Sequence, residues 1–174
     1  MNALNPWNST LLPPTGEAGG LRVATYNIHK GVRGVGPRKR LEIHNLGLGV
    51  EALDADLVFL QEVQGLHLGH PQRHSSWPAQ PQHEFLAEES WQQTAYGGNA
   101  VYDHGHHGNA ILSRHDIVSH TNQDVSAHRF ERRGLLHCEI QLPGIDVAVH
   151  CVCVHLGLTG GGRKRQMETL AERM

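Results

Sequence analysis

The hydrophobic and polar positions predict an alternation of strands and helices in the first half of the chain. Residues 21–27 form a short apolar run that ends at Asn27 and is followed by a glycine-rich loop, as expected for a strand. Apolar residues recur near helical spacing over residues 38–53, which predicts a helix even though Gly47 and Gly49 weaken it. Residues 57–60 are continuously apolar and predict a buried strand that ends at Gln61 and Glu62.

The second half is predominantly β in pattern. Residues 63–82 are polar and contain three prolines, which predicts a long surface loop, and residues 84–91 predict a short helix. Strands are then predicted at residues 95–102, 108–113, 117–124, 133–141 and 145–156, with turns at Gly97-Gly98, Gly105 and Pro143-Gly144. An amphipathic helix is predicted from Arg163 to Met174. This order is typical of a mixed α/β (α+β) domain in which sheets are layered with helices.

Length and composition narrow the class of protein. The 174 residues suffice for one domain, predicted at 21–174, after a flexible leader at 1–20 that is rich in Pro, Gly, Asn and Ser. Fifteen Lys and Arg against 17 Asp and Glu argue against a protein dedicated to packaging nucleic acid, but not against its hydrolysis. No signal peptide or membrane span is evident, and three cysteines are an odd number, so we predict reduced thiols and a cytoplasmic location.

Two strand ends carry side chains suited to a hard metal ion. A right-handed crossover between the first two strands makes them parallel, so Asn27 and Glu62 are predicted at the same sheet edge. Carboxylate and amide oxygens are ligands that suit Mg²⁺. On spacing alone, a solvated glutamate and a turn-forming asparagine are the favoured explanation of these residues.

Five segments occur in an order that matches a known family. They are VATYNIHKG (residues 23–31), LVFLQEV (57–63), GNAILSR (108–114), RRGLLHCE (132–139) and CVHL (153–156). In this order and spacing they resemble the motifs of the endonuclease/exonuclease/phosphatase superfamily. The segments NIHKG and GHHGNAILSR are most similar to a bacterial branch of it.

The resemblance implies a four-layer αββα sandwich of the DNase I-like type and hydrolysis of a phosphoric ester, expected to be a phosphodiester, by in-line attack of water. It implies that Glu62 holds Mg²⁺ or Mn²⁺ and that Asn27 lies beside it. It implies further that His155 stabilises the charge on the phosphoryl oxygens and that Arg133 contacts phosphate. Nucleic acid, a phospholipid and an inositol phosphate all remain open as the substrate.

Three further residues are weaker candidates for substrate contacts. His29 stands where some members of the superfamily carry an aspartate that assists the metal, and it is either a phosphate or Mn²⁺ contact or a polar loop residue. His107 and Asn109 lie at or just before the third motif, where they either contact substrate or belong to a solvated loop.

The superfamily's Gly-Asp-Phe-Asn and Ser-Asp-His motifs, which position and activate the attacking water, do not occur in these 174 residues. We therefore expect a C-terminally truncated domain that is an incomplete catalyst by itself and that associates through exposed sheet surface. One alternative is a half-domain that binds metal or phosphate without turnover. Another is a histidine-rich metal-binding protein, suggested by DHGHH (103–107) and HCVCVH (150–155), although no C-x-x-C spacing occurs.

Overall fold

The computed structural model describes residues 20–34, 39–88, 90–128 and 130–173. In chain order the elements are β1 (Val23–Asn27), η2 (His29–Gly31), β2 (Val32–Arg33), β3 (Arg40–Leu41), α1 (Ile43–Glu51), β4 (Leu57–His67), α2 (His70–Arg73), α3 (Gln82–Ala87), β5 (Gln93–Tyr102), β6 (Gly105–Ser113), β7 (Asp116–Asp124), β8 (Gly134–Gln141), β9 (Val149–Val154) and α4 (Gly160–Arg173). The predicted leader lies outside the described residues except for Gly20, which has no regular structure.

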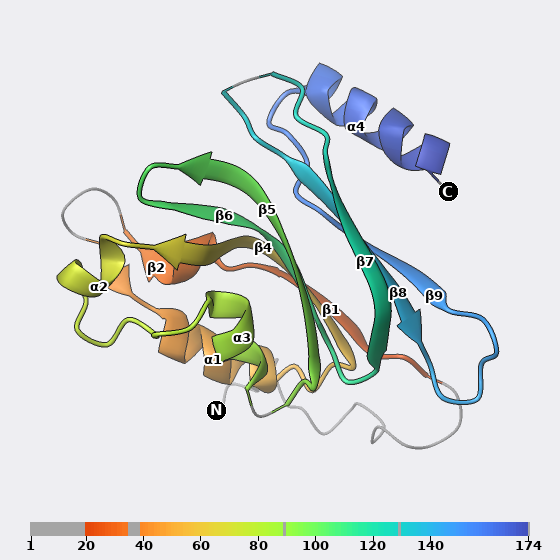
Figure 1. Ribbon diagram of the computed structural model, residues 1–174, viewed down its shortest axis with the longest axis horizontal. Coiled ribbons are helices and arrows are strands. Elements are labelled where there is room, and N and C mark those ends of the chain that lie inside the picture. Colours follow the sequence, from red (N-terminus) through yellow and green to blue (C-terminus); the bar gives the residue numbers. More distant parts are fainter. Residues whose placement is uncertain (1–19, 35–38, 89, 129, 174) are drawn as a thin grey trace, which may run out of the picture.

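Two larger sheets form the centre of the molecule (Figure 1). The first has the strand order β1-β4-β6-β5, and the second has the order β7-β8-β9. Strands β1 and β4 are parallel, as predicted, and Asn27 pairs with Gln61. The parallel register therefore brings the ends of the first two motifs to one edge of the sheet.

The first sheet is covered on both faces. On one face Val58 and Leu60 pack with residues of α1 and α3, including Ile43 and Leu86. On the other face Leu57 packs against the second sheet in a core that also holds Ile111, Leu136, Ile140 and the three cysteines. Burial on both faces explains why residues 57–60 are apolar without alternation.

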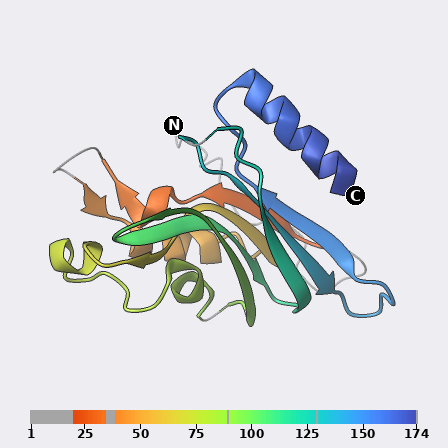
Figure 2. The same ribbon diagram turned by 45° about the horizontal axis from the view of Figure 1, so that its top comes forward.

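Helix α4 follows β9 and lies beyond the second sheet, on the side away from α1 and α3 (Figures 1 and 2). The described chain thus has a helical layer, two larger sheets, the small β2–β3 sheet and one outer helix, which is a mixed α/β arrangement. None of the described helices combines the length and the apolar character that crossing a membrane requires.

The largest difference from the predicted elements is at β4. The prediction of a surface loop from residue 63 is wrong for residues 63–67, because β4 continues to His67 and pairs again with β6 from Val63 onward. Gln64 is fully buried there, and its amide donates to the carbonyls of Leu66 (2.8 Å) and His106 (2.7 Å). A buried polar strand of this kind has no hydrophobic pattern by which it could be recognised.

Other boundaries also differ. Residues 40–41 form β3, paired with β2, so the helix predicted at 38–53 is limited to Ile43–Glu51. Gly97 and Gly98 are not a turn but lie inside β5, opposite Asn109 and Gly108. The close strand approach explains the glycines, since a Cβ on Gly108 would lie 1.8 Å from the Gly97 carbonyl oxygen. Helix α4 begins at Gly160, three residues before the predicted start.

A buried side chain on β6, that of Asn109, links the two larger sheets by hydrogen bonds. Its side-chain amide donates to the carbonyls of Gly134 on β8 (3.0 Å) and Cys153 on β9 (3.3 Å), and the residue is 1% exposed. Asn109 therefore bridges the two sheets at the place where β8 begins and β9 ends.

We expect Asn109→Ala to lower the free energy of unfolding by about 2–3 kcal/mol, because two buried carbonyl groups lose their donor. Urea denaturation measures the change. The control is Asn45→Ala, since the exposed Asn45 side chain bonds to Glu42 at the surface of α1 and its loss is expected to cost less than about 0.5 kcal/mol. Equal losses for the two variants would contradict the bridging role.

Candidate active site

The central feature of the site is a bulge in β4 at Glu62. Its φ of 54° is left-handed, which is unfavourable for a residue with a Cβ by about 1–2 kcal/mol. The pairing of β4 with β6 shifts between Leu60 and Val63, so Glu62 is released from the regular ladder. The bulge turns its carboxylate away from the core. Strained backbone that persists in a buried strand is a reason to suspect a functional position.

Three neighbouring groups surround the Glu62 carboxylate. Asn27 Nδ2 donates to Oε1 at 3.0 Å, Lys30 Nζ lies 3.2 Å from Oε2, and His29 Nδ1 lies 3.7 Å from the same oxygen. Burial raises the pKa of Glu62, but the Asn27 hydrogen bond and the Lys30 and His29 charges outweigh it and lower the pKa to about 2. The carboxylate is therefore ionised at neutral pH.

Asn27 organises the loop that follows β1. Its Oδ1 accepts a hydrogen bond from the backbone N–H of His29 at 3.0 Å, which closes a tight turn after the strand. His29 and Lys30 then adopt left-handed conformations with φ of 47° and 60°. One asparagine amide thus holds the loop with its oxygen and Glu62 with its nitrogen.

Gln82, the first residue of α3, holds the two chain segments of this site together. Its Nε2 donates to the Lys30 carbonyl and its Oε1 accepts from the Gln64 backbone N–H, both at 2.8 Å. The loop approaches so closely that a Cβ on Gly31 would lie 2.4 Å from Gln82 Nε2. Neither Lys30 nor Gln82 was predicted from the sequence. The position of Lys30 within NIHKG was the available signal, whereas Gln82 lies outside every motif.

The Glu62 carboxylate opens into a hollow with a volume of about 590 Å³. The hollow is also lined by Lys30 and by two cations from the β2–β3 region, Arg33 and Lys39, with Glu42 as a further carboxylate. Cations outnumber carboxylates in its lining, so an anionic ligand is favoured there.

A second hollow, of about 480 Å³, adjoins Arg133 and His107. The Arg133 guanidinium forms an ion pair with Glu131 at 3.0 Å, and both side chains are largely buried. Two apolar residues on its rim, Phe130 and Leu158, are each 82% exposed. This hollow therefore combines a held guanidinium with exposed apolar surface.

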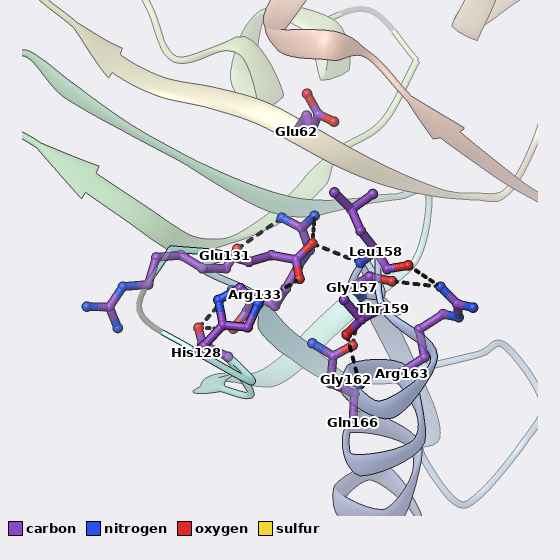
Figure 3. A network of polar contacts seen from close by, with 12 residues as sticks. Glu62, His128, Glu131, Arg133, Gly157, Leu158, Thr159, Gly162, Arg163 and Gln166 are labelled. Carbon is purple, nitrogen blue, oxygen red and sulfur yellow. Dashed lines mark hydrogen bonds and ion pairs between the residues drawn. The ribbon is translucent and has the colours of Figure 1, made fainter.

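Glu131 and Gln166 join the segments that carry Arg133 and His155 (Figure 3). Glu131 Oε1 accepts from the backbone N–H of Leu158 at 2.9 Å as well as from Arg133. Gln166 Oε1 accepts from the Gly157 N–H at 2.8 Å, and its Nε2 donates to the Val125 carbonyl at 3.1 Å. The loop before β8 and the loop after β9 are consequently fixed to each other.

His155 lies immediately after β9 and is half-buried. Burial lowers its pKa, and the Arg133 charge lowers it further, while the carboxylates of Glu62 and Glu131 act in the opposite direction. The charges of both Glu62 and Arg133 therefore act on the pKa of the His155 imidazole.

His107 lies on β6 rather than in the loop that was expected, because β6 begins at Gly105. Burial first, and then the Lys30 charge, lower its pKa to about 4. Its Nδ1 is hydrogen-bonded to the Tyr102 hydroxyl at 2.5 Å. The imidazole is therefore neutral at neutral pH and can present Nε2–H as a donor.

The predicted residues thus form two groups and one outlier, and the two groups are connected because the Glu62 charge also acts on His107 and His155. Asn27, His29 and Glu62 lie together, and His107, His155 and Arg133 interact electrostatically with one another. Asn109 is buried between the sheets, where it has a structural role. Its predicted contact with substrate stays a prediction.

The donor set suits a hard divalent ion held only in part by protein. Glu62 supplies one ionised carboxylate, and Asn27 supplies an amide whose oxygen already accepts the His29 N–H. Within the described ranges, no cluster of three or more His, Cys, Asp and Glu residues is arranged to hold a metal. Mg²⁺ commonly binds through one or two carboxylates, water and substrate phosphate, so Glu62 fits it without such a cluster.

The His- and Cys-containing segments are used in packing. Cys138, Cys151 and Cys153 are free and buried in the core between the sheets. His106 bonds to the Tyr96 hydroxyl at 2.9 Å, and the His104 ring contacts Tyr102. His150 pairs with His137 at 2.8 Å across β8 and β9.

Comparisons with known proteins agree with this arrangement. A sequence profile described as the Endonuclease/Exonuclease/phosphatase family matches residues 24–171. The chain is 44% identical over 161 residues to the uncharacterized protein YbhP of Escherichia coli K12, and equally so to YbhP of Shigella flexneri. The alignment covers 92% of this chain and 63% of YbhP, so the chain spans less than two thirds of these relatives.

Solved structures show the same fold. An endonuclease/exonuclease/phosphatase from Beutenbergia cavernae superposes with a TM-score of 0.68 at 23% identity, over 88% of this chain and 44% of its own. A family protein from Leptotrichia buccalis superposes with a TM-score of 0.65 at 14% identity, over 89% of this chain and 63% of its own.

The low pKa of His107 has a consequence for stability. Its ordinary pKa is about 6.5, so the unfolded chain takes up a proton at a higher pH than the folded chain does. The stabilisation is complete above about pH 6.5 and is lost as the pH falls toward 4. We expect His107→Gln to flatten the pH dependence of unfolding in this window, by at most about 3 kcal/mol. Urea denaturation between pH 4 and 7 measures it, and equal slopes for both proteins would contradict the prediction.

Proposed function

Because the chain belongs to the endonuclease/exonuclease/phosphatase family, we propose that it forms part of a divalent-metal-dependent hydrolase of phosphodiesters. The observation that carries this proposal is the ionised Glu62 carboxylate, exposed by a strained bulge and hydrogen-bonded to Asn27. A buried strand gains nothing in packing from such a residue. A metal ligand would explain the strain, and the low pKa keeps the carboxylate ionised, as binding of a metal ion requires.

Glu62 would hold Mg²⁺ or Mn²⁺, with Asn27 fixing the orientation of the carboxylate. The ion would supply positive charge to a phosphoryl oxygen and to the attacking water. Water and a substrate phosphate would complete its coordination, as is usual for Mg²⁺. The hollow beside Glu62 is lined by Lys30, Arg33 and Lys39, which favour an anion there.

The second group of residues would bind the phosphate from another side. Arg133 is held by Glu131 and would offer its charge to the phosphoryl oxygens. His155 and the neutral His107 would donate hydrogen bonds to oxygens that gain charge as the ester is cleaved. His29, 3.7 Å from Glu62, is a further candidate for contact with phosphate.

The attacking water needs a base that these residues do not supply. Neither a Gly-Asp-Phe-Asn nor a Ser-Asp-His segment occurs in the 174 residues, and the chain covers 63% of YbhP. We propose that in a whole domain this group, and further layers of the sandwich, come from residues beyond this part. The substrate is proposed only as a phosphodiester, whether nucleic acid, phospholipid or inositol phosphate.

A second candidate function is binding of metal and phosphate without turnover by these residues alone. The observation in its favour is that Glu62, Asn27 and Arg133 are already held by neighbours within the described chain. The histidine-rich metal protein is not proposed, because His104, His106 and His107 are engaged in contacts with tyrosines.

We expect Mn²⁺ to raise the melting temperature of this chain by several degrees and Glu62→Gln to abolish the rise, because only the charged side chain binds the ion. Differential scanning calorimetry measures the shift. Glu42→Gln is the matched control, since it removes a carboxylate from the same hollow and should retain the rise.

Hydrolysis of a chromogenic bis-aryl phosphodiester, measured on the same three proteins, distinguishes the two candidates. Mn²⁺-dependent turnover that falls by at least about 100-fold in Glu62→Gln supports catalysis. A shift in melting temperature without turnover supports binding alone. Equal stabilisation of the parent and Glu62→Gln would refute both.

A further inference from the structure

The Lys30 ammonium contacts the carboxylate of Glu62, the residue proposed to hold a metal ion. Its Nζ lies 3.2 Å from Glu62 Oε2, and the two side chains are 33% and 20% exposed. The other carboxylate oxygen, Oε1, accepts the Asn27 amide. Oε2 is thus the oxygen that faces the Lys30 ammonium, and the His29 ring lies farther from it, at 3.7 Å.

The backbone of Lys30 is fixed, whereas its side chain is not. The Lys30 carbonyl accepts from the buried Gln82, and hydrogen bonds of 2.9 Å join Gly31 N–H to the Ile28 carbonyl and Glu42 N–H to the Gly31 carbonyl. The ammonium is at the end of a flexible four-carbon stem, and its one described polar partner is Glu62. A change at Glu62 can therefore move the ammonium without moving the loop.

A divalent ion and an ammonium group at one carboxylate repel each other. The repulsion is strong in a partly buried site, where solvent screens charge poorly. Metal binding at Glu62 therefore requires the Lys30 side chain to withdraw. The hollow beside it is the available space, and it is already lined by Arg33 and Lys39. An anion in that hollow would neutralise the displaced charge.

We propose that Lys30 is an internal counter-cation of Glu62, which the divalent metal displaces and which then binds the phosphate of the substrate. The inference rests on the metal site proposed above. Lys30 weakens metal binding while no phosphate is present and strengthens phosphate binding once the metal is in place. The two ligands are then positively coupled, and by linkage each raises the affinity for the other to the same extent.

Isothermal titration calorimetry of this 174-residue chain with Mn²⁺, and with inorganic phosphate in saturating Mn²⁺, tests the inference. We expect Lys30→Met to bind Mn²⁺ about five- to tenfold more tightly and phosphate about five- to tenfold more weakly than the parent. Lys30→Arg, which keeps the charge, should lie closer to the parent in both titrations.

The matched control is Arg33→Met. It removes one positive charge from the same hollow, but Arg33 has no described ion pair with Glu62, so Mn²⁺ affinity should change by less than about twofold. Opposite changes in the two affinities are the distinguishing result, since a residue with a merely structural role would weaken both when replaced.

The outcomes separate this inference from the proposed function. If Mn²⁺ binding requires Glu62 but is unchanged or weakened in Lys30→Met, the inference about Lys30 is overturned and the proposed metal site is not. Binding that is the same in the parent, Lys30→Met and Glu62→Gln overturns the metal site as well. If Lys30→Met and Arg33→Met gain equally in Mn²⁺ affinity, the effect is one of net charge, and this outcome also refutes the inference.

Discussion

The structure depends on the burial of β4 on both faces. One face packs with α1 and α3 and the other with the second sheet, so a regular strand at this place has no position for an ionised side chain. A charged residue can reach solvent from such a strand only where the ladder is interrupted. The bulge at Glu62 is that interruption, and the pairing with β6 resumes at Val63. The requirement for a rigid, buried centre thus determines both where the carboxylate emerges and the strain associated with it.

Buried amide side chains carry much of the organisation around the site. Gln82 joins the loop after β1 to the strand beyond the bulge, and Gln166 joins the loop before β8 to the loop after β9. Each glutamine supplies one donor and one acceptor to backbone groups of two separate segments, which satisfies those groups where no strand pairing is available. Asn109 also links two segments, one in each of two strands of the second sheet, but it does so by donating from its amide nitrogen to both carbonyls. Loops that carry charged residues are in this way as firmly placed as strands.

The sequence predicted most of the strands and the position of Asn27 and Glu62 at one edge of the sheet. Both depend on local patterns, namely apolar runs and the crossover rule for parallel strands. It did not predict the continuation of β4 past Glu62, because Gln64 is polar and its burial is stabilised by hydrogen bonds to Leu66 and His106. It also missed Lys30, Gln82 and Glu131 as parts of the site. Their roles arise from contacts between distant segments, which neither periodicity nor motif spacing records.

The electrostatics of the site follow from the same arrangement. In the described residues, the Glu62 carboxylate is surrounded by donors and cations, while His107 and His155 are held neutral by burial and by neighbouring positive charge. A neutral imidazole can donate a hydrogen bond to a phosphoryl oxygen without adding to the repulsion between Lys30, Arg133 and a metal ion. The excess of fixed positive charge is then relieved only when an anion enters. In the function proposed above, such a site would favour an anionic ligand such as a phosphate ester, since an uncharged ester would leave that repulsion in place.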